Sequence, residues 1–435
     1  MPIHTIRIGE DEHAFSVAGG DLAGVLEPGT PEIAAPASAI LRECLETPIR
    51  APRLRDLARG RRSAVILIPG IDRVAGTREY VTALVDELHR AGLHDRNITV
   101  VLAPGTHPHS LDADLPRLLG PELAGRVRGL GHDCHAKDRL RDLGTTRFGT
   151  PVLLNRDVLD ADLKILTGRV IPHYFAGFSG GRKALLPGVA GFASILANHR
   201  LTLAADSGIH PAVAPGSLQG NPVHLDMLEA SLMAKPDFCL STLLDGDGRL
   251  VGAVAGDVLA SHEEACRLAR QMFHRTIPAP VDVLITSAGG HPYDINFMQS
   301  LKAVFNVEAI VRPGGAVLWL AACPAGIHPG FLEWANVIGD EELDHAVRRA
   351  YDLTGHNSVM LRRLRRRAEV ALCSTLPANV VARLGLRPVA SVDEGLAWIR
   401  RRFPAGFRYA VVPVANIVSA TIEPEQPATG HRPAR

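Results

Sequence analysis

The hydrophobic positions of this chain fall into short continuous runs separated by stretches with helical spacing. Residues 64–68 (AVILI) are apolar throughout and residues 98–102 (ITVVL) are apolar except for Thr99, which is typical of strands buried on both faces. Between these runs, residues 78–91 form an amphipathic pattern with apolar side chains at Val81, Leu84, Val85 and Leu88. Buried strands that alternate with amphipathic helices predict a mostly parallel sheet covered by helices. Functional residues in such sheets gather in loops beyond the carboxyl ends of the strands.

The same alternation continues through most of the sequence. Residues 1–28 alternate between apolar and polar positions, which predicts a hairpin of half-buried strands. Further along, we expect two strands within residues 151–172 and helices over residues 190–197, 222–233 and 258–273. A second series of strands and helices follows, with strands expected at residues 281–285, 316–321, 369–372 and 409–412.

The chain has 435 residues, too many for one ordinary hydrophobic core, so we expect two domains. Residues 274–280 (HRTIPAP) hold two prolines in a short polar stretch and mark the expected boundary. We therefore predict an α/β protein with an N-terminal domain at residues 1–275 and a C-terminal domain at residues 281–415. Residues 416–435 are expected to form a disordered tail, because their last part is polar and rich in proline.

Composition narrows the function classes. The 47 basic and 46 acidic side chains nearly cancel, which argues against broad binding to nucleic acid or to an anionic membrane. The six cysteines have no CxxC spacing, as in a reduced protein without a disulfide framework or a structural zinc site. No apolar run reaches the ~18 residues of a spanning helix, and the N-terminal residues lack the apolar core of a signal peptide. We therefore expect a cytoplasmic protein.

The strongest candidate for chemistry is the segment at residues 173–188, HYFAGFSGGRKALLPG. Its glycines give backbone freedom where a phosphate or a flat ring must approach the chain closely. Arg182 should push the neighbouring Lys183 toward its neutral, nucleophilic form. His173 and His199 flank this lysine and can titrate near neutrality. An unremarkable glycine-rich turn with a solvated lysine is the alternative explanation of this segment taken alone.

Three further segments offer candidate side chains. His107 lies in GTHPHS directly after an expected strand, where a histidine can serve as a general base or a metal ligand. Arg73 follows another strand in PGIDR and could hold a carboxylate with two parallel hydrogen bonds. Gln299 and Lys302, in GGHPYDINFMQSLK, would share one helical face and suit a carboxylate or hydroxy-acid substrate, with Asp294 as a helix N-cap.

Simpler explanations apply to parts of these segments. A surface ion pair with Asp72 could account for Arg73, and a solvated helix face could account for Gln299 and Lys302. Residues 131–138 (GHDCHAKD) hold two histidines and a cysteine, but their spacing matches no strong zinc pattern and favours a polar turn.

Together these segments resemble the nickel-pincer-nucleotide-dependent lactate racemase family. The resemblance extends from about residue 5 to about residue 412, and its most specific part is HYFAGFSGGRKALLPG followed by ANH at residues 197–199. It implies two α/β domains with the active site in the cleft between them. It also implies nickel and a pyridinium-3,5-bisthiocarboxylic acid mononucleotide, the nickel-pincer nucleotide, joined to Lys183 through a thioamide.

The resemblance further implies roles for individual residues. His199 would be the protein ligand to nickel, while His107 and His173 would alternate as acid and base, and Lys183 would be part of the catalytic centre. Residues 70–73 (Gly70, Ile71, Asp72 and Arg73) would contact the cofactor, and the substrate would be held by Arg73, Gln299 and Lys302. The expected partners are a small 2-hydroxy acid and, transiently, the proteins that mature the cofactor.

The implied chemistry is physically sensible. Removing the α-proton of a 2-hydroxy acid would create a carbanion beside a carboxylate. Loss of that hydrogen as hydride to the cofactor gives a flat 2-oxo acid instead, and the hydride can return to either face. Because a base is needed on each side of that plane, two histidines suit the reaction better than one. Imidazole together with soft sulfur donors is a reasonable ligand set for nickel.

Two positions depart from the family pattern. Many relatives have an aspartate and a threonine before the arginine, whereas this chain has Gly70, Ile71 and Asp72, so the aspartate's contact with the cofactor is lost or taken over by Asp72. Before Gln299, an aromatic hydroxyl of lactate-active relatives is replaced by Met298, which makes the pocket less polar there. The prediction is therefore a racemase or epimerase of 2-hydroxy acids, with the substrate's side chain left open.

Two other functions remain open from the sequence. A metal-dependent hydrolase could use His107, His173 and His199 as ligands with one open position, although this leaves Lys183 unexplained. A non-catalytic carrier of a nucleotide-like cofactor could use the glycine-rich segment as a phosphate cradle.

Overall fold

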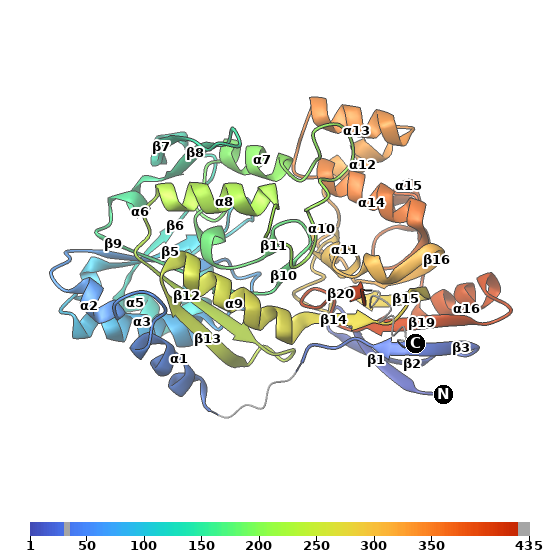
Figure 1. Ribbon diagram of the computed structural model, residues 1–435, viewed down its shortest axis with the longest axis horizontal. Coiled ribbons are helices and arrows are strands. Elements are labelled where there is room, and N and C mark those ends of the chain that lie inside the picture. Colours follow the sequence, from blue (N-terminus) through green and yellow to red (C-terminus); the bar gives the residue numbers. More distant parts are fainter. Residues whose placement is uncertain (30–34, 425–435) are drawn as a thin grey trace, which may run out of the picture.

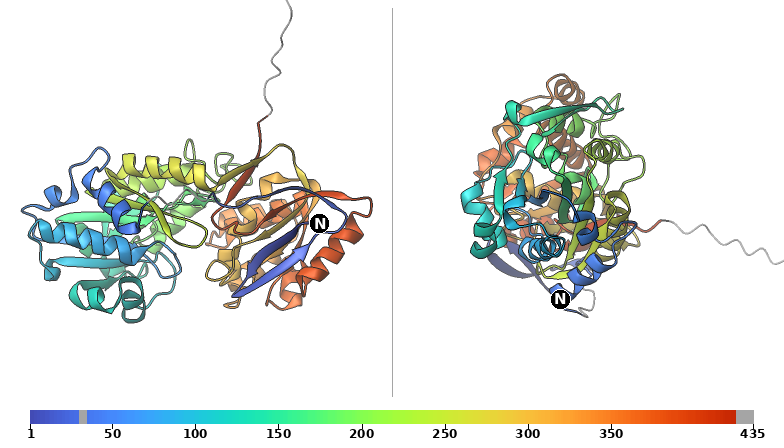
Figure 2. Two further views of the ribbon diagram at one scale, coloured as in Figure 1. Left: turned by 90° about the horizontal axis from the view of Figure 1, so that it is seen from below. Right: turned by 90° about the vertical axis from the view of Figure 1, so that its left-hand side faces the viewer.

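Two lobes, each built around a six-stranded sheet, make up the chain (Figure 1). This computed structural model describes residues 1–29 and 35–424. The expected two-domain α/β architecture with mostly parallel sheets is confirmed. In the view from below, the lobes lie side by side and are joined by a few crossing segments (Figure 2).

The first lobe contains a sheet with the strand order β13-β12-β9-β4-β5-β6. Every neighbouring pair is parallel except β12 and β13, which are antiparallel. These strands are β4 (Ala64–Pro69), β5 (Ile98–Ala103), β6 (Arg128–Gly131), β9 (Leu163–Arg169), β12 (Phe238–Leu244) and β13 (Leu250–Gly256).

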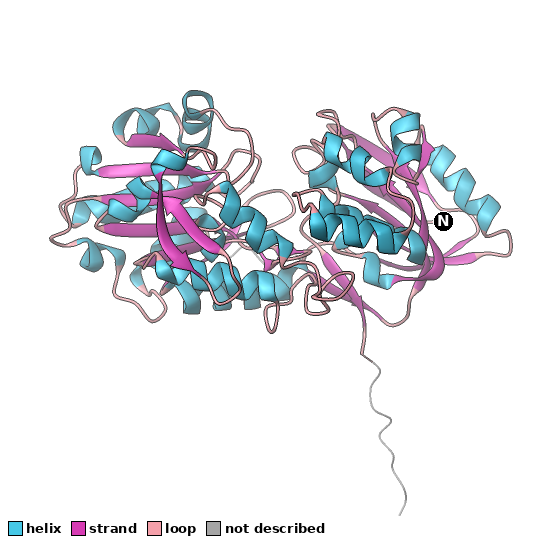
Figure 3. Ribbon diagram, turned by 90° about the horizontal axis from the view of Figure 1, so that it is seen from above, coloured by secondary structure: helices cyan, strands magenta, loops and turns pink. Residues whose placement is uncertain are grey.

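Burial on both faces explains the continuous apolar runs of this sheet. In β4, Ile66 and Ile68 belong to one apolar cluster, while Val65 and Leu67 belong to another on the opposite face. Helices on both faces cover the sheet (Figure 3), so a polar side chain in these strands needs a hydrogen-bond partner, as Thr167 finds by donating to the carbonyl oxygen of Leu67 at 2.6 Å. The covering helices are α1 (Ala37–Glu46), α2 (Leu54–Ala58), α3 (Thr77–Arg90), α4 (Leu111–Leu119), α5 (Pro121–Arg126), α6 (Arg156–Asp160), α7 (Phe192–Arg200), α8 (Pro222–Met233) and α9 (Val258–Phe273).

The second lobe contains a fully parallel sheet with the order β18-β17-β16-β15-β19-β3. Its strands are β3 (Gly20–Val25), β15 (Val281–Ser287), β16 (Val311–Leu320), β17 (Ala368–Cys373), β18 (Arg387–Val389) and β19 (Phe407–Val412). Its helices are α10 (Phe297–Ser300), α11 (Lys302–Phe305), α12 (Pro329–Ala335), α13 (Asp340–Arg349), α14 (Gly355–Arg367), α15 (Ala378–Arg383) and α16 (Val392–Arg402).

The first 25 residues do not follow the expected boundary at residues 1–275. The predicted hairpin is present as β1 (Ile3–Ile8) and β2 (Asp11–Ser16), but β3 pairs with β19 at the edge of the second sheet. His4 also approaches the hydroxyl of Tyr409 to 2.9 Å, which ties the hairpin to the same lobe. Strand periodicity identifies a half-buried strand but not the sheet that it joins, and this is why the sequence pattern misplaced it.

The chain also departs from expectation where it crosses between the lobes. The proline-containing boundary begins with β14 (His274–Ile277), which pairs in parallel with β20 (Ser419–Ile422). Residues 416–424, expected to belong to a disordered tail, therefore include an ordered strand, while residues 425–435 of that tail lie outside the described residues. The polar composition missed this strand because its pairing partner lies far away in the sequence.

Two short strand pairs complete the fold. The strand pairs β7 (Leu140–Thr145) with β8 (Pro151–Asn155) and β10 (Pro172–His173) with β11 (Gly177–Phe178) decorate the first lobe. All six cysteines are buried and free. Within the described residues, no helix is both long and apolar enough to cross a membrane.

Candidate active site

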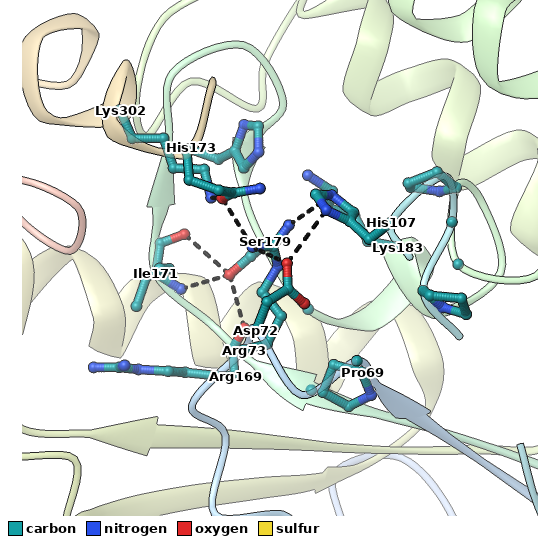
Figure 4. A pocket seen from close by; sticks show the side chains of 18 of the residues that line it. Pro69, Asp72, Arg73, His107, Arg169, Ile171, His173, Ser179, Lys183 and Lys302 are labelled. Carbon is teal, nitrogen blue, oxygen red and sulfur yellow. Dashed lines mark hydrogen bonds and ion pairs between the residues drawn. The ribbon is translucent and has the colours of Figure 1, made fainter. Parts of the chain in front are cut away.

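A cavity of about 220 Å³ lies between the two lobes and collects most of the predicted site residues. The first lobe lines it with the loops that follow β4, β5 and β9, and the second lobe lines it with α10, α11 and the start of α14. The carboxyl ends of neighbouring parallel strands meet there, as expected for an open α/β sheet. Figure 4 shows the side chains of this cavity.

Asp72, Arg73 and His107 form a polar group at the ends of adjacent strands (Figure 4). The carboxylate of Asp72 lies 3.1 Å from Nη1 of Arg73 and 3.3 Å from Nδ1 of His107. The other ring nitrogen of His107 lies 3.2 Å from Nη2 of Arg73. The structure thus adds Asp72 as an anchor that fixes the orientation of the His107 ring.

The second lobe completes this group with Gln299 and Lys302. The amide oxygen of Gln299 accepts hydrogen bonds from Lys302 Nζ at 2.8 Å and from Arg73 Nη1 at 3.0 Å. One neutral acceptor therefore holds two cations from different lobes side by side. Such a pair of donors suits a carboxylate.

The start of this helical segment differs from the expectation. Asn296, and not Asp294, caps α10, with its side chain accepting from the Gln299 amide at 2.9 Å. Asp294 is buried and accepts from the backbone amides of Gly9 at 2.7 Å and Ala322 at 2.9 Å. A buried carboxylate needs such donors, because its desolvation would otherwise be costly, and the sequence does not show that Gly9 comes near.

The glycines of the 173–188 segment are needed for close packing within the protein. A Cβ on Gly177 would lie 2.1 Å from the carbonyl oxygen of Ser217, and φ at Gly177 is +76°. A Cβ on Gly181 would lie 2.6 Å from the ring of His262. At these two positions the neighbour is the chain's own backbone or side chain, whereas the expectation was a bound phosphate or ring.

Arg182 and Lys183 lie on one short turn but face different surroundings. Arg182 is 1% exposed and donates to the carbonyl oxygens of Ala176 at 2.8 Å and Phe178 at 3.0 Å. Lys183 lines the cavity, with Nζ 5.4 Å from the centre of the Phe175 ring. The predicted nucleophile therefore faces the cavity, and its charged neighbour faces the core.

His173 and His199 line the same cavity on either side of Phe175. The ring centres of His173 and Phe175 lie 4.4 Å apart, and those of Phe175 and His199 lie 4.9 Å apart. Nδ1 of His199 is buried without a hydrogen-bond partner of acceptable geometry. A buried imidazole in that condition can serve as a ligand.

Burial and the clustered cations shift the pKa values of the site in a common direction. Burial and the charge of Arg73 lower the pKa of His107 to about 4, against the opposing effect of Asp72. Burial, with Lys183 as the next cause, lowers the pKa of His173 well below its usual value. The histidines are thus neutral near pH 7 and available as bases.

The amines behave similarly. Burial first, and then the charge of Arg182, lowers the pKa of Lys183 well below its usual value. Burial and Arg73 do the same to the pKa of Lys302. For Asp72, burial alone would raise the pKa, but Arg73, His107 and Lys302 outweigh it and the pKa is lowered. The pocket therefore contains one carboxylate, that of Asp72, among arginine, lysine and histidine side chains, an arrangement that favours an acidic ligand.

Sequence reasoning missed two polar residues of the cavity wall. His356 from α14 lies 6.3 Å from His199 between ring centres, and its Nδ1 is 2.7 Å from the hydroxyl of Tyr351. Arg169, at the end of β9, donates to the hydroxyl of Tyr293 in the other lobe at 2.9 Å. Arg169 follows a buried strand, which is a signal that could have identified it, whereas nothing near His356 in the sequence marks it.

The two remaining residues predicted to contact the cofactor, Gly70 and Ile71, differ in their position relative to the cavity. Gly70 lines the cavity, whereas Ile71 does not. In the GHDCHAKD segment, His132 is buried and approaches the carbonyl oxygen of Ala190 to 3.0 Å, so its ring is held by the backbone of the first lobe.

Metal binding by protein side chains alone finds no support. Among residues 1–29 and 35–424, no group of three or more histidine, cysteine, aspartate or glutamate side chains is placed to hold a metal ion. The alternative three-histidine site at His107, His173 and His199 is not formed.

The residues present fit a covalently held pyridinium cofactor with nickel. Lys183 and His199 line one cavity, and the Phe175 ring packs against both, with its centre 5.4 Å from Lys183 Nζ and 4.9 Å from the centre of the His199 ring. A single imidazole cannot hold a metal alone, so the other donors must come from the bound group.

Comparisons with known proteins identify the family of this chain. Residues 8–209 match the model of the lactate racemase N-terminal domain, and residues 277–419 match that of the lactate racemase C-terminal domain. A lactate racemase from Thermoanaerobacterium thermosaccharolyticum is 32% identical over 76% of both chains. One from Lactiplantibacillus plantarum is 30% identical over 71% of this chain and 72% of its own length.

Solved structures show the same relationship. The lactate racemase apoprotein from T. thermosaccharolyticum superimposes with a TM-score of 0.87 at 26% identity, covering 96% of this chain and 100% of the other. A Thermotoga maritima protein shares the fold, with a TM-score of 0.68 at 16% identity over 91% of this chain and 100% of its own. By sequence and by structure, this chain belongs to the lactate racemase family, a family of isomerases.

Proposed function

We propose that this protein is a 2-hydroxy-acid racemase or epimerase that works through a 2-oxo acid, with a nickel-pincer nucleotide as its cofactor. The observation that most supports this is that one cavity is lined by the carboxylate-binding group Arg73, Gln299 and Lys302, by the half-buried histidines His107 and His173, and by Lys183 together with His199. We expect the protein in the cytoplasm, where proteins that mature the cofactor would meet it transiently.

The substrate's carboxylate would bind to Arg73 and Lys302. Gln299 accepts hydrogen bonds from both and so aligns their donors across the cleft. Because burial and Arg73 lower the pKa of Lys302, an arriving carboxylate would also stabilise its charged form. The two lobes would thereby close on the substrate through the same contact.

His107 and His173 would exchange the hydroxyl proton. Both are neutral near pH 7, because burial lowers their pKa values, so either can accept that proton from a substrate enantiomer presented to it. Nδ1 of His107 lies 3.3 Å from the Asp72 carboxylate and Nε2 lies 3.2 Å from Nη2 of Arg73, so Nε2 would accept the proton once Arg73 turns to the carboxylate of the substrate. As the hydroxyl loses its proton, Arg73 and Lys302 would stabilise the carboxylate of the flat intermediate and keep it from leaving.

Lys183 would hold the cofactor covalently, His199 would be its protein ligand to nickel, and Gly70 and Asp72 would border it. When bound, the nickel-pincer nucleotide supplies a reversible acceptor for the α-hydrogen as hydride. The Phe175 ring, between His173 and His199, would exclude water from that part of the site. Met298, which lines the cavity, would allow a substrate side chain that is less polar or larger than that of lactate.

The route of the α-hydrogen gives a decisive experiment. Matured protein is incubated in D₂O with a single enantiomer of lactate and, separately, of larger 2-hydroxy acids, and products are separated by chiral chromatography and weighed by mass spectrometry. We expect the opposite enantiomer to form without solvent deuterium at C2. Deuterium at C2 would show proton abstraction and overturn the hydride route. Loaded protein that inverts none of the acids would favour the carrier function instead.

A further inference from the structure

Arg182 is a fully buried cation that no described carboxylate pairs with. Its Nη2 donates to the carbonyls of Ala176 and Phe178, and its Nη1 lies 2.9 Å from Nε2 of His262 on α9. Burial lowers its pKa to about 10, so it is still charged at neutral pH. A buried charge without an ion-pair partner is costly, and such groups persist where they serve a purpose.

The hydrogen bonds of Arg182 determine the shape of the glycine-rich turn. Ala176 and Phe178 flank Gly177, so the guanidinium holds the strand pair β10 and β11 against the turn that carries Lys183. The backbone of Lys183 is fixed as well, since its amide donates to Gly180 at 3.1 Å and its carbonyl accepts from Gly188 at 3.0 Å. With both ends held, the Lys183 side chain extends into the cavity.

The surroundings of Lys183 are cationic or neutral on every side. The centre of the Phe175 ring lies 5.4 Å from its Nζ, and among residues 1–29 and 35–424 no carboxylate forms an ion pair with it. The ionisable groups that face it from the packed elements are Arg182 on its own turn, Arg73 and His107 from the first sheet, His173 from β10, His199 from α7, and Lys302 from the second lobe. Arg182 differs from the rest because it is shielded from substrate and solvent.

We propose that Arg182 is a positioning residue whose buried guanidinium holds the glycine-rich turn so that the Lys183 amine points into the cavity. Burial is the first cause that lowers the pKa of this amine, and the fixed charge of Arg182 is the second. Only a free amine can form a bond to an acyl or thioacyl carbon. An adjacent fixed cation disfavours the protonated amine whether or not substrate, cofactor or the second lobe is in place. This inference rests on the proposed function only for the identity of the group that Lys183 attaches.

The test uses the full-length protein without cofactor and a small acylating probe, N-hydroxysuccinimidyl acetate. The amine nitrogen bonds to the acetyl carbon, the ester C–O bond breaks, N-hydroxysuccinimide leaves, and the proton passes to buffer. The rate at Lys183 is followed by peptide mapping from about pH 6 to 10, with exposed Lys137 as an internal reference. The variants are R182Q, which removes the charge, R182K, which keeps it, and the matched control R267Q, which removes an exposed arginine paired with Glu264.

In the wild type, Lys183 should react at lower pH than Lys137. R182Q should shift the Lys183 profile to higher pH and reduce its rate at pH 7 by about three- to tenfold, since one pKa unit changes the free amine about tenfold. R182K and R267Q should keep the wild-type profile. An R182Q profile that coincides with the wild type, or an R182K profile shifted like that of an exposed lysine, would overturn the proposal. If R182Q does not fold, R182M takes its place, because it also removes the charge and keeps an unbranched side chain, and the same outcomes apply to its Lys183 profile.

The same experiment separates this inference from the proposed function. The probe needs neither nickel, nucleotide nor substrate, so the Lys183 profile stands even if the protein never racemises a hydroxy acid. The converse result is a wild type that loads cofactor and racemises hydroxy acids while the pH profile of Lys183 acetylation stays the same in R182Q. That result overturns this inference and leaves the proposed function intact.

Discussion

Replacing Gln299 with glutamate should weaken the binding of substrate and at the same time make the folded protein more stable. The wild-type amide oxygen accepts from Lys302 at 2.8 Å and from Arg73 at 3.0 Å, yet its neutrality leaves both cations available to a substrate carboxylate. Gln299→Glu keeps the size and shape of the side chain and adds a negative charge between the two cations. The new carboxylate then competes with the carboxylate of the substrate.

The magnitude follows from these contacts. A hydrogen bond to a charged group is worth about 1.5–3 kcal/mol, and we expect the substrate to lose the equivalent of one. At about 1.4 kcal/mol per tenfold, kcat/KM should fall about 10- to 150-fold. Because Gln299 is only 6% exposed, the added charge pairs with both cations within the protein, and the unfolding midpoint should rise by about 2–4 °C.

The assay compares kcat/KM of matured protein for several 2-hydroxy acids with the melting temperature of the same preparations. Gln271→Glu is the matched control, because it adds the same charge at an exposed position on α9. The control should leave kcat/KM unchanged. Unchanged kcat/KM in Gln299→Glu would place the substrate's carboxylate elsewhere, and lower stability in that variant would refute the assigned cationic pair.

Two further predictions concern stability. The folded protein lowers the pKa of His107 from 6.5 to about 4 and also lowers that of His173. Between pH 6.5 and pH 4 the unfolded chain therefore binds more protons than the folded protein. The free energy of unfolding should fall by about 1–3 kcal/mol as the pH drops through this range. Urea unfolding at several pH values checks this, and a constant free energy would contradict the neutral histidines. Gly177→Ala should lower the free energy of unfolding by more than about 2 kcal/mol, because the added methyl group would meet the Ser217 carbonyl. Gly19 has a similar φ of +77° but no atom within 4 Å of an added Cβ, so Gly19→Ala should lower it by only about 1–2 kcal/mol. Equal losses in these two variants, measured in urea, would show that the close approach is relieved by a small shift.

Much of the fold could be predicted from local patterns. The runs at β4, β5 and β15 and the helices α8 and α9 were expected within a few residues, because burial on both faces or on one stripe leaves a clear period in the sequence. The partners of β3 and β20 could not be predicted in this way. Their pairings join residues far apart in the sequence, and neither strand's own composition reveals the neighbour that completes it.

The site residues likewise divide into those that local sequence patterns predicted and those that they could not. Loops after strands identified Arg73 and His107, and helical spacing identified Gln299 and Lys302, which do meet at the cavity. The sequence could not show that Asp72 anchors the His107 ring or that His356 enters the cavity from the second lobe. Both depend on how loops and lobes come together, and residue spacing carries no information on that.

Covalent attachment of the cofactor to Lys183 underlies the whole proposed mechanism, and an intact mass tests it. Protein is produced in cells that can build the cofactor, weighed under conditions that leave thioamides intact, and mapped by peptide around residue 183, beside Lys183→Ala. We expect an added mass on the Lys183 peptide that is missing from the variant. Wild-type protein that interconverts enantiomeric hydroxy acids while this peptide keeps its unmodified mass would rule out the covalent attachment.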